Sequence, residues 1–141
     1  VDDFNNIYKV KRGINISYKN DGKNKYLIYG IENRIEQIIA NLLDNAISFS
    51  DDNKDVIVQV SKSEDNKVYI KILDEGQGFK EKDTNKIFKR FYSNRPDKFG
   101  QHSGLGLNIV KNLVDLHNAT IKATNRQDKK GASMEIEFPK V

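Results

Sequence analysis

The longest regular pattern of apolar residues runs from residue 34 to residue 50 and predicts a helix. Seven apolar residues recur there at intervals of three and four, as in a helix that buries one face: Ile35, Ile38, Ile39, Leu42, Leu43, Ala46 and Ile47. On the other face, Asn41 and Asn45 are four residues apart, so their side chains project from the same side. Asparagine is a middling helix former that usually serves at caps and turns. The pair indicates either a polar pocket that uses neutral oxygen ligands or a solvated face with incidental asparagines.

Alternating apolar and polar residues predict strands before and after this helix. The predicted strands lie at 14–18, 26–29, 56–60, 68–73, 121–124 and 132–138. Polar turns at 64–66 and 129–131 would join the third strand to the fourth and the fifth to the sixth as hairpins. A second helix is predicted at 104–116, because Leu107, Val110 and Val114 line up on one of its faces.

This order of elements favours an α+β fold, because strands and helices are mixed without strict βαβ alternation. We expect a two-layer α/β sandwich, in which about three helices cover one face of a mixed, mostly antiparallel sheet. Residues 1–13 would be a linker or a first element. Residues 80–103 form a long polar stretch of the kind that acts as a lid over a ligand or is partly disordered.

Composition narrows the class of protein. The 141 residues suffice for one domain with one core, and 37% hydrophobic with 31% charged residues is typical of a soluble globular domain. The chain has no cysteine, which excludes disulfides, thiolate metal sites and cysteine nucleophiles. The net charge of +4 is mild and the lysines are interleaved with acids, which argues against nucleic-acid binding. With no long apolar run and no signal-peptide pattern, we expect this segment neither to contact a membrane nor to direct its own export.

A glycine-rich turn, Asp74-Glu75-Gly76-Gln77-Gly78, follows directly on the strand predicted at 68–73. Two glycines that flank one residue allow the backbone to turn tightly and to approach a ligand. An aspartate at a strand end can accept a hydrogen bond from an amino group such as that of adenine. An ordinary strand-ending turn would have the same sequence. The stretch is no dinucleotide-binding fingerprint, because it lacks the third glycine and the helix that would follow at once.

A second glycine-containing stretch, Gly104-Leu105-Gly106-Leu107, opens the second predicted helix. Backbone N–H groups at a helix N-terminus suit phosphate oxygens, although glycine pairs also occur at plain loop-to-helix joints. No P-loop sequence is present anywhere in the chain, so a nucleotide site of that type is excluded.

The polar stretch contains an aromatic segment, residues 87–92. Phe88 and Phe91 would anchor it to the core, unless the segment is an ordinary amphipathic turn. Arg90 and Arg95 could then reach phosphate groups with their planar guanidinium groups.

Taken together and in this order, these motifs resemble those of the ATP-binding catalytic domain of sensor histidine kinases, within the Bergerat-type ATPase superfamily. Residues 41–46 resemble the N box of that family, 74–78 its G1 box, 87–92 its F box and 104–107 its G2 box. The segment 131–139 is similar to the last strand of the family. The resemblance covers residues 14–141 and implies a Bergerat fold in which residues 80–103 form the ATP lid.

The resemblance also implies a Mg-ATP site. Asn45 would help to hold Mg²⁺ together with the ATP phosphates, and Asn41 would lie close to the triphosphate. Arg90 and Arg95 would approach the γ-phosphate from the lid and stabilise the charge that develops during transfer. The glycine-rich turns would complete the nucleotide contacts through Gly76, Gly78, Gly104, Leu105, Gly106 and Leu107.

On the adenine side of the implied site, Asp74 would accept a hydrogen bond from the adenine amino group. Ser133 would support this contact through water, and Phe49 would flank the adenine ring. Ser48 departs from the family pattern, which commonly has Lys or Arg at that position in contact with phosphate.

Asn41 bears on the reaction. In the relatives that hydrolyse ATP, the residue that corresponds to Asn41 is a Glu, which activates water as a general base. An amide cannot take a proton at neutral pH, so Asn41 favours a kinase. We therefore expect transfer of the γ-phosphoryl group to a histidine. The alternatives are a Bergerat-type ATPase that works as a conformational clamp and a non-catalytic module that binds a partner.

The acceptor histidine is expected on another domain. Neither His102 nor His117 is followed by an acidic residue, as the phosphorylated histidine of the family is. The resemblance thus implies that the chain is part of a longer bacterial phosphoprotein, a homodimer with a helical hairpin for dimerisation and phosphoacceptance. A response regulator would act downstream in two-component signalling. The domain would be cytoplasmic and the parent protein anchored in the inner membrane.

Overall fold

The computed structural model describes residues 15–19, 28, 30–50, 53–79, 87–88 and 105–140 of the chain. They contain two helices, α2 (Glu32–Phe49) and α3 (Leu105–Leu116). They also contain five strands: β1 (Asn15–Lys19), β2 (Asp55–Lys62), β3 (Val68–Leu73), β4 (Thr120–Asn125) and β5 (Ala132–Phe138).

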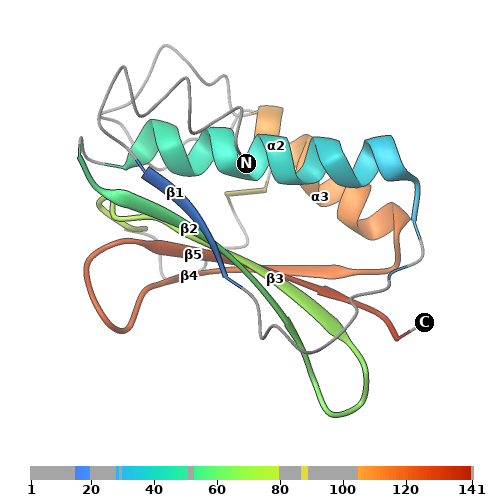
Figure 1. Ribbon diagram of the computed structural model, residues 1–141. Coiled ribbons are helices and arrows are strands. Elements are labelled where there is room, and N and C mark those ends of the chain that lie inside the picture. Colours follow the sequence, from blue (N-terminus) through green and yellow to red (C-terminus); the bar gives the residue numbers. More distant parts are fainter. Residues whose placement is uncertain are drawn as a thin grey trace.

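The five strands form one sheet in the order β1-β2-β3-β5-β4. β1 pairs with β2 in parallel, and the other neighbouring strands pair antiparallel. Both helices lie on the same face of the sheet (Figure 1). The predicted two-layer α/β sandwich with a mixed, mostly antiparallel sheet is therefore confirmed.

The predicted elements coincide with the observed ones to within a few residues. α2 begins two residues before the predicted start, and β5 has the predicted bounds. Of the strand predicted at 26–29 the structure describes only Ile28, which belongs to no strand or helix. Of the aromatic segment it describes Ile87 and Phe88, which form a short 3-10 turn and are buried. The rest of the segments 1–13 and 80–103 lies outside the described residues.

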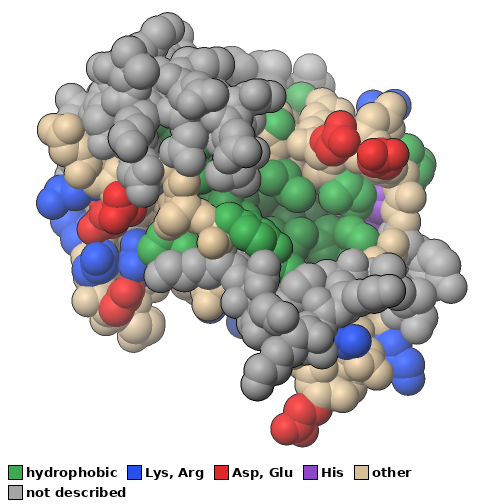
Figure 2. Space-filling model, viewed as in Figure 1, with side chains coloured by type: hydrophobic (Ala, Val, Ile, Leu, Met, Phe, Trp, Pro, Cys, Tyr) green, Lys and Arg blue, Asp and Glu red, His purple; other side chains and the backbone are tan. Residues whose placement is uncertain are grey.

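The core lies between the two layers. Ile38 and Ile47 of α2, together with Val110 of α3, have no exposed surface, and the apolar face of the sheet packs beneath them. Burying a side chain of this kind contributes roughly 1.5–3 kcal/mol. Burial alternates along β3, as expected for a strand with one face toward the helices. In Figure 2, hydrophobic side chains are visible between the layers, and charged side chains flank them.

The sandwich has two ends that differ in character. At the site end, on the left in Figure 1, the C-terminus of α2, the end of β3 and the β4–β5 turn lie together. At the opposite end lie the start of α2, the end of α3 and the β2–β3 hairpin turn. Within the described residues, neither helix is long and apolar enough to cross a membrane.

At the opposite end, the side chain of His117 connects the two helices. The backbone N–H of Ile31 donates to His117 Nε2 at 3.1 Å, and His117 Nδ1 lies 2.7 Å from the carbonyl oxygen of Leu113. A neutral imidazole has one donor and one acceptor, so Nδ1 carries the proton and donates to Leu113. This buried histidine therefore has a structural role, in keeping with its lack of a phosphoacceptor sequence.

Candidate functional site

The C-terminal half of α2 carries polar side chains on a buried surface. Asn45 is only 8% exposed and Asn41 is half-buried, although both lie on the face away from the apolar stripe. Ser48, Phe49 and Ser50 are also buried. A solvated face with incidental asparagines would be exposed at Asn45. The burial therefore favours the polar-pocket interpretation of the asparagine pair.

Asp74, at the end of β3, is the most deeply buried carboxylate of the described residues, with 3% of its surface exposed. Its Oδ1 accepts hydrogen bonds from the backbone N–H of Gly76 at 2.9 Å and of Ala132 at 3.0 Å. A carboxylate can accept about four hydrogen bonds, and these two orient the group. Asp74 is thus held by two segments that are far apart in the sequence.

Glycine is required at two positions around Asp74 because the backbone approaches itself closely. A Cβ on Gly76 would overlap the carbonyl oxygen of Phe49, and a Cβ on Gly131 would overlap the carbonyl oxygen of Asp74. Both contacts would fall far below 3.0 Å, a separation under which real Cβ contacts essentially never occur. Gly131 also has a φ of +148°, which side chains disfavour. The first glycine-rich turn is therefore more than an ordinary strand-ending turn.

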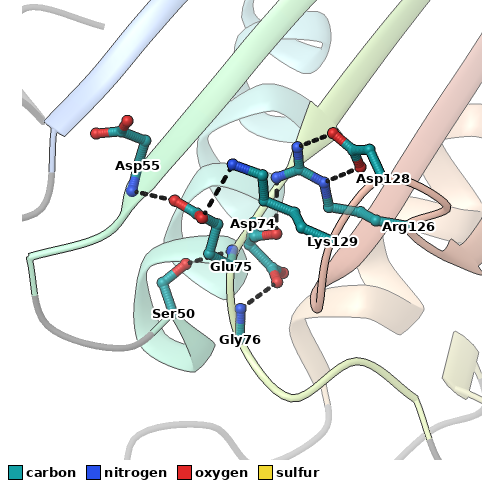
Figure 3. Close-up of polar contacts among 8 residues, drawn as sticks. All are labelled: Ser50, Asp55, Asp74, Glu75, Gly76, Arg126, Asp128 and Lys129. Atoms are coloured by element: carbon teal, nitrogen blue, oxygen red, sulfur yellow. Dashed lines mark hydrogen bonds and ion pairs between the residues drawn. The ribbon is translucent and has the colours of Figure 1, made fainter.

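A network of polar groups lies beside Asp74 and joins four segments of the chain (Figure 3). The backbone N–H of Asp55, at the start of β2, donates to Glu75 Oε2 at 2.8 Å, and Lys129 Nζ lies 3.3 Å from Glu75 Oε1. The backbone N–H of Glu75 donates to Ser50 Oγ at 3.4 Å. The hydrogen bond from Asp55 and the ammonium of Lys129 lower the pKa of Glu75 below its ordinary value.

Arg126, in the β4–β5 turn, also reaches the backbone of Asp74 (Figure 3). Its Nη1 donates to the Asp74 carbonyl oxygen at 3.1 Å. Its Nε and Nη2 donate to the two carboxylate oxygens of Asp128 at 3.0 and 2.9 Å, and these bonds lower the pKa of Asp128. The Arg126 side chain is only 4% exposed. Arg126 could not be picked out from the sequence, because an arginine in a polar hairpin turn has the pattern of a solvated surface.

Asn125 fixes the segment that follows the first glycine-rich turn. Its Oδ1 accepts from the backbone N–H of Phe79 at 2.6 Å, and its Nδ2 donates to the carbonyl oxygen of Phe79 at 3.1 Å. The buried Phe79 directly precedes the stretch predicted to form the lid. Asn125 could not be picked out from the sequence either. A polar residue directly after the strand predicted at 121–124 gives no signal of a long-range partner.

The structure brings most of the predicted site residues to the site end. Ser133 is buried on β5 opposite Leu73, which precedes Asp74, and Gly78 is buried in the turn. Gly106 is exposed and Leu107 half-buried in the first turn of α3, where the described part of the second glycine-rich stretch begins at Leu105. Arg90, Arg95 and Gly104 lie outside the described residues.

The donor set fits Mg²⁺ shared with a phosphate ligand. Among the described residues, no three His, Asp or Glu side chains gather into a group that could hold a metal ion. Magnesium usually keeps waters and phosphate oxygens and takes one or two protein oxygens. The neutral amide oxygens of Asn41 and Asn45, on the same side of α2, suit that kind of shared site.

The chain matches a family model over residues 30–141. The family is described as histidine kinase-, DNA gyrase B- and HSP90-like ATPase. A curated relative, the sensor protein ChvG of Agrobacterium fabrum, is 36% identical over 128 residues. The match covers 86% of the chain but only 21% of ChvG, so the chain spans about a fifth of this relative's length.

Solved structures of similar fold include full-length ShkA in complex with AMPPNP. It has a TM-score of 0.78 and 25% identity, and the match covers 94% of this chain and 27% of that one. The histidine kinase ThkA in complex with the response regulator protein TrrA has a TM-score of 0.75 and 25% identity. That match covers 94% of this chain and 36% of the ThkA chain.

Proposed function

Because the chain belongs to the family of histidine kinase-, DNA gyrase B- and HSP90-like ATPases, we propose that it is the ATP-binding catalytic domain of a sensor histidine kinase. It binds Mg-ATP at the site end, between the C-terminal half of α2 and the turn after β3. The observation that carries the proposal is the buried carboxylate of Asp74, oriented by two backbone N–H groups. Burying a carboxylate at a strand end is costly unless donors meet it, and here the two backbone N–H groups do so.

Asp74 selects the base of the nucleotide. The exocyclic amino group of adenine donates a hydrogen bond, whereas guanine presents a carbonyl oxygen at the corresponding position, which a carboxylate repels. Phe49, at the end of α2, offers an apolar face to the flat base, and Ser133 lies within the same end of the sheet. This arrangement supports a preference for ATP over GTP.

Asn41 and Asn45 serve the triphosphate end of the nucleotide. When bound, Mg²⁺ neutralises phosphate charge and orients the γ-phosphoryl group. Asn45 supplies an amide oxygen to that ion, and the arginines proposed for the lid, Arg90 and Arg95, stabilise charge on the leaving phosphoryl group. Asn41 has no basic atom that could take a proton from water. The site is therefore suited to transfer rather than to hydrolysis.

The acceptor is a histidine nitrogen on a helical hairpin of the parent protein. The bond from the γ-phosphorus to the bridging oxygen of ADP breaks as the bond to the histidine nitrogen forms. A response regulator is the next partner, a proposal supported by the structure of the similar ThkA with TrrA. By the same resemblance, the parent is a homodimer anchored in a membrane, with this domain on the cytoplasmic side.

The Asp74→Asn variant tests the base-reading role. An asparagine keeps an oxygen for Gly76 and Ala132 but replaces the other carboxylate oxygen with an amino group, which cannot accept from adenine. Loss of a hydrogen bond to a charged group should weaken ATP binding about tenfold or more, and should weaken GTP binding much less. Isothermal titration of wild type and variant with both nucleotides measures this.

A matched control for that experiment is Asp115→Asn, which changes an exposed aspartate of α3 that pairs only with Lys111 in the described part of the chain. It should leave both affinities unchanged. If Asp74→Asn keeps the wild-type preference for ATP over GTP, the base-reading assignment is wrong.

The Asn45→Ala variant tests the magnesium site. Binding of ATP should lose its dependence on Mg²⁺, because the amide oxygen that would share the ion is gone. Titration of ATP with and without Mg²⁺ measures the difference, and the circular dichroism spectrum shows whether α2 is intact. A folded variant in which Mg²⁺ strengthens ATP binding as much as in wild type would exclude Asn45 as a ligand.

A further inference from the structure

Arg126 is unusual for an arginine in a hairpin turn. Its partner Asp128 is exposed, with a side-chain exposure of 64%, whereas the Arg126 side chain is exposed by only 4%. A pair that served the surface alone would leave both side chains in solvent, where such pairs contribute little. The guanidinium is instead turned inward, so that one of its N–H groups reaches the carbonyl oxygen of Asp74 (Figure 3).

Both ends of the β4–β5 turn contact Asp74. The backbone N–H of Asp74 donates to the Ala132 carbonyl oxygen at 2.9 Å, and the N–H of Ala132 donates to Asp74 Oδ1. The turn itself is closed by the N–H of Arg126, which donates to the Gly131 carbonyl oxygen at 2.9 Å. Residues at the two ends of this turn thus contact both the backbone and the side chain of Asp74.

The contact from Arg126 controls the orientation of one peptide group. The peptide bond between Asp74 and Glu75 is planar, so its carbonyl oxygen and its N–H turn together. Arg126 holds the oxygen, and Ser50 Oγ accepts from the N–H at 3.4 Å. These two bonds fix the backbone dihedral ψ of Asp74, and with it the direction in which the chain carries Gly76 back to the carboxylate.

We propose that Arg126 is a positioning residue of the nucleotide site, which sets the orientation of the Asp74 carboxylate and thereby the preference for adenine. The inference rests on the proposed function, in which Asp74 reads the base. Arg126 acts through Asp74 and does not touch the nucleotide. Asp128 acts one step further out, because its two oxygens hold the guanidinium in the plane that points Nη1 at Asp74.

The central variant is Arg126→Ala, studied in the full 141-residue chain. Affinity for ATP should fall about five- to twentyfold, as expected for loss of a buried, charged hydrogen bond that orients the reading group. Affinity for GTP should change little, so that the ratio of the two dissociation constants shrinks. Titration with each nucleotide in the presence of Mg²⁺ measures both constants.

Two further variants should reduce the preference for ATP less than Arg126→Ala does. Arg126→Lys retains a cation that can reach the carbonyl oxygen but loses the paired bonds to Asp128, so it should restore part of the ATP preference. Asp128→Asn changes an exposed residue and should give a smaller loss in the same direction. Arg34→Ala, which removes an exposed arginine from the first turn of α2, is the matched control and should leave both affinities unchanged.

A readout that needs no nucleotide is amide hydrogen exchange. The amides of Gly76 and Ala132 donate to Asp74 Oδ1, so they should exchange faster in Arg126→Ala, while amides of β2 keep their protection. Equal loss of ATP and GTP affinity, or faster exchange throughout the sheet, would show that Arg126 only stabilises the fold and would overturn the proposal. Unchanged affinities would overturn it as well. If Arg126→Ala does not fold, Arg126→Lys and Asp128→Asn decide by the same criteria.

The Asp74→Asn variant, titrated alongside, separates the two proposals. If it loses the preference for ATP and Arg126→Ala does not, the positioning role is wrong and the base-reading role stands. If Asp74→Asn keeps the preference, or wild type binds no ATP, the base-reading role fails and the positioning role fails with it.

Discussion

The two ends of the sandwich use similar bonds for different purposes. At the opposite end, one buried side chain, that of His117, bonds to two backbone groups and holds the start of α2 to the end of α3. At the site end, backbone N–H groups, a guanidinium and close glycine contacts all converge on Asp74. The bonds at the opposite end connect elements, whereas those at the site end also orient a buried carboxylate.

The contrast gives a criterion for a functional site. Holding a fold together needs satisfied polar groups and packed side chains, and His117 provides both with few partners. Orienting a buried carboxylate requires several donors, because a buried charge costs stability unless it is hydrogen-bonded or paired. Variants at the site end should therefore change ligand recognition as well as stability, and variants at the opposite end should change stability alone.

The largest effect is expected for Gly131→Ala at the site end. The new methyl group would overlap the backbone carbonyl oxygen of Asp74, and the residue would keep a positive φ. Since neither backbone segment can move cheaply, we expect a loss of about 3 kcal/mol or more in the free energy of unfolding. Thermal and urea unfolding measure this.

The matched control for that glycine is Gly106→Ala in α3. A Cβ there would meet nothing within 4 Å, so alanine should be neutral or should stabilise the helix by up to about 1 kcal/mol. If Gly131→Ala is as stable as wild type, the close approach at the site end is not rigid and the contrast between the ends is lost.

At the opposite end, His117→Ala should cost about 2–3 kcal/mol in the free energy of unfolding. The substitution leaves the backbone N–H of Ile31 without its side-chain acceptor and opens a cavity between the helices. The ratio of ATP to GTP affinity should stay at its wild-type value, because the change is remote from Asp74. Urea unfolding and nucleotide titration measure the two quantities.

The neighbouring Leu116→Ala is the control for His117, because Leu116 is 60% exposed and its loss should change stability by no more than about 0.5 kcal/mol. A change in the ATP-to-GTP ratio of the His117 variant would mean that the opposite end communicates with the site, and that the two ends are not independent.

The difference between the ends also explains what could be predicted from the sequence. The helix with Asn41 and Asn45, the strand before Asp74 and the last strand were predicted because their periodicity and glycine spacing are local features. The burial of Asn45 and the close backbone approach at Gly76 depend on packing, but the segments 41–46 and 74–78 already indicated a pocket and a tight turn there. These parts of the site could be predicted from short stretches of sequence.

Arg126, Asn125 and His117 could not be assigned from the sequence. Each makes a decisive contact with a residue distant in the chain, at separations of 52, 46 and 86 residues for Asp74, Phe79 and Ile31. No period or motif marks such pairs, because they depend on which strand ends and helix ends meet in space. Asp74 could therefore be singled out from its own short stretch of sequence, whereas Arg126, which bonds to its backbone, could not.

The next largest effect is expected at the site end in acid, where Glu75 makes stability depend on pH. The pKa of Glu75 in the folded protein is lowered from its ordinary value of 4.5. The ionised carboxylate therefore contributes fully to the free energy of unfolding above pH 4.5, and this contribution is lost as pH falls through the folded-state pKa. Glu75→Gln should cost about 1 kcal/mol near neutral pH, and this cost should vanish in acid. Urea unfolding from pH 7 downward measures it, with the exposed Glu64→Gln of the β2–β3 turn as control. A cost that does not change with pH would mean that the carboxylate charge contributes nothing.

Alkali should reveal a smaller effect at the opposite end, through Tyr69. Its hydroxyl donates to Glu137 Oε1 at 2.6 Å across the β3–β5 pair, and this bond raises the pKa of Tyr69 from 10.0 to about 12. Because the pKa is raised, the protonated hydroxyl contributes fully to the free energy of unfolding below about pH 10, and this contribution is lost as pH rises toward 12. The Tyr69→Phe variant should therefore be less stable than wild type at neutral pH, and the two stabilities should converge in strong alkali.

The control for Tyr69 is Tyr18→Phe, because Tyr18 is 51% exposed on β1. Thermal midpoints between pH 7 and pH 12 should then fall less steeply for Tyr69→Phe than for wild type or for this control. Because Tyr69 lies near the hairpin turn, the ATP-to-GTP ratio measured at neutral pH should be the same in all three proteins. A shifted ratio in Tyr69→Phe would show that β3 transmits changes along its length to Asp74. The two ends would then be coupled through that strand, and the site could not be treated as a local assembly of the turn, the helix end and Arg126.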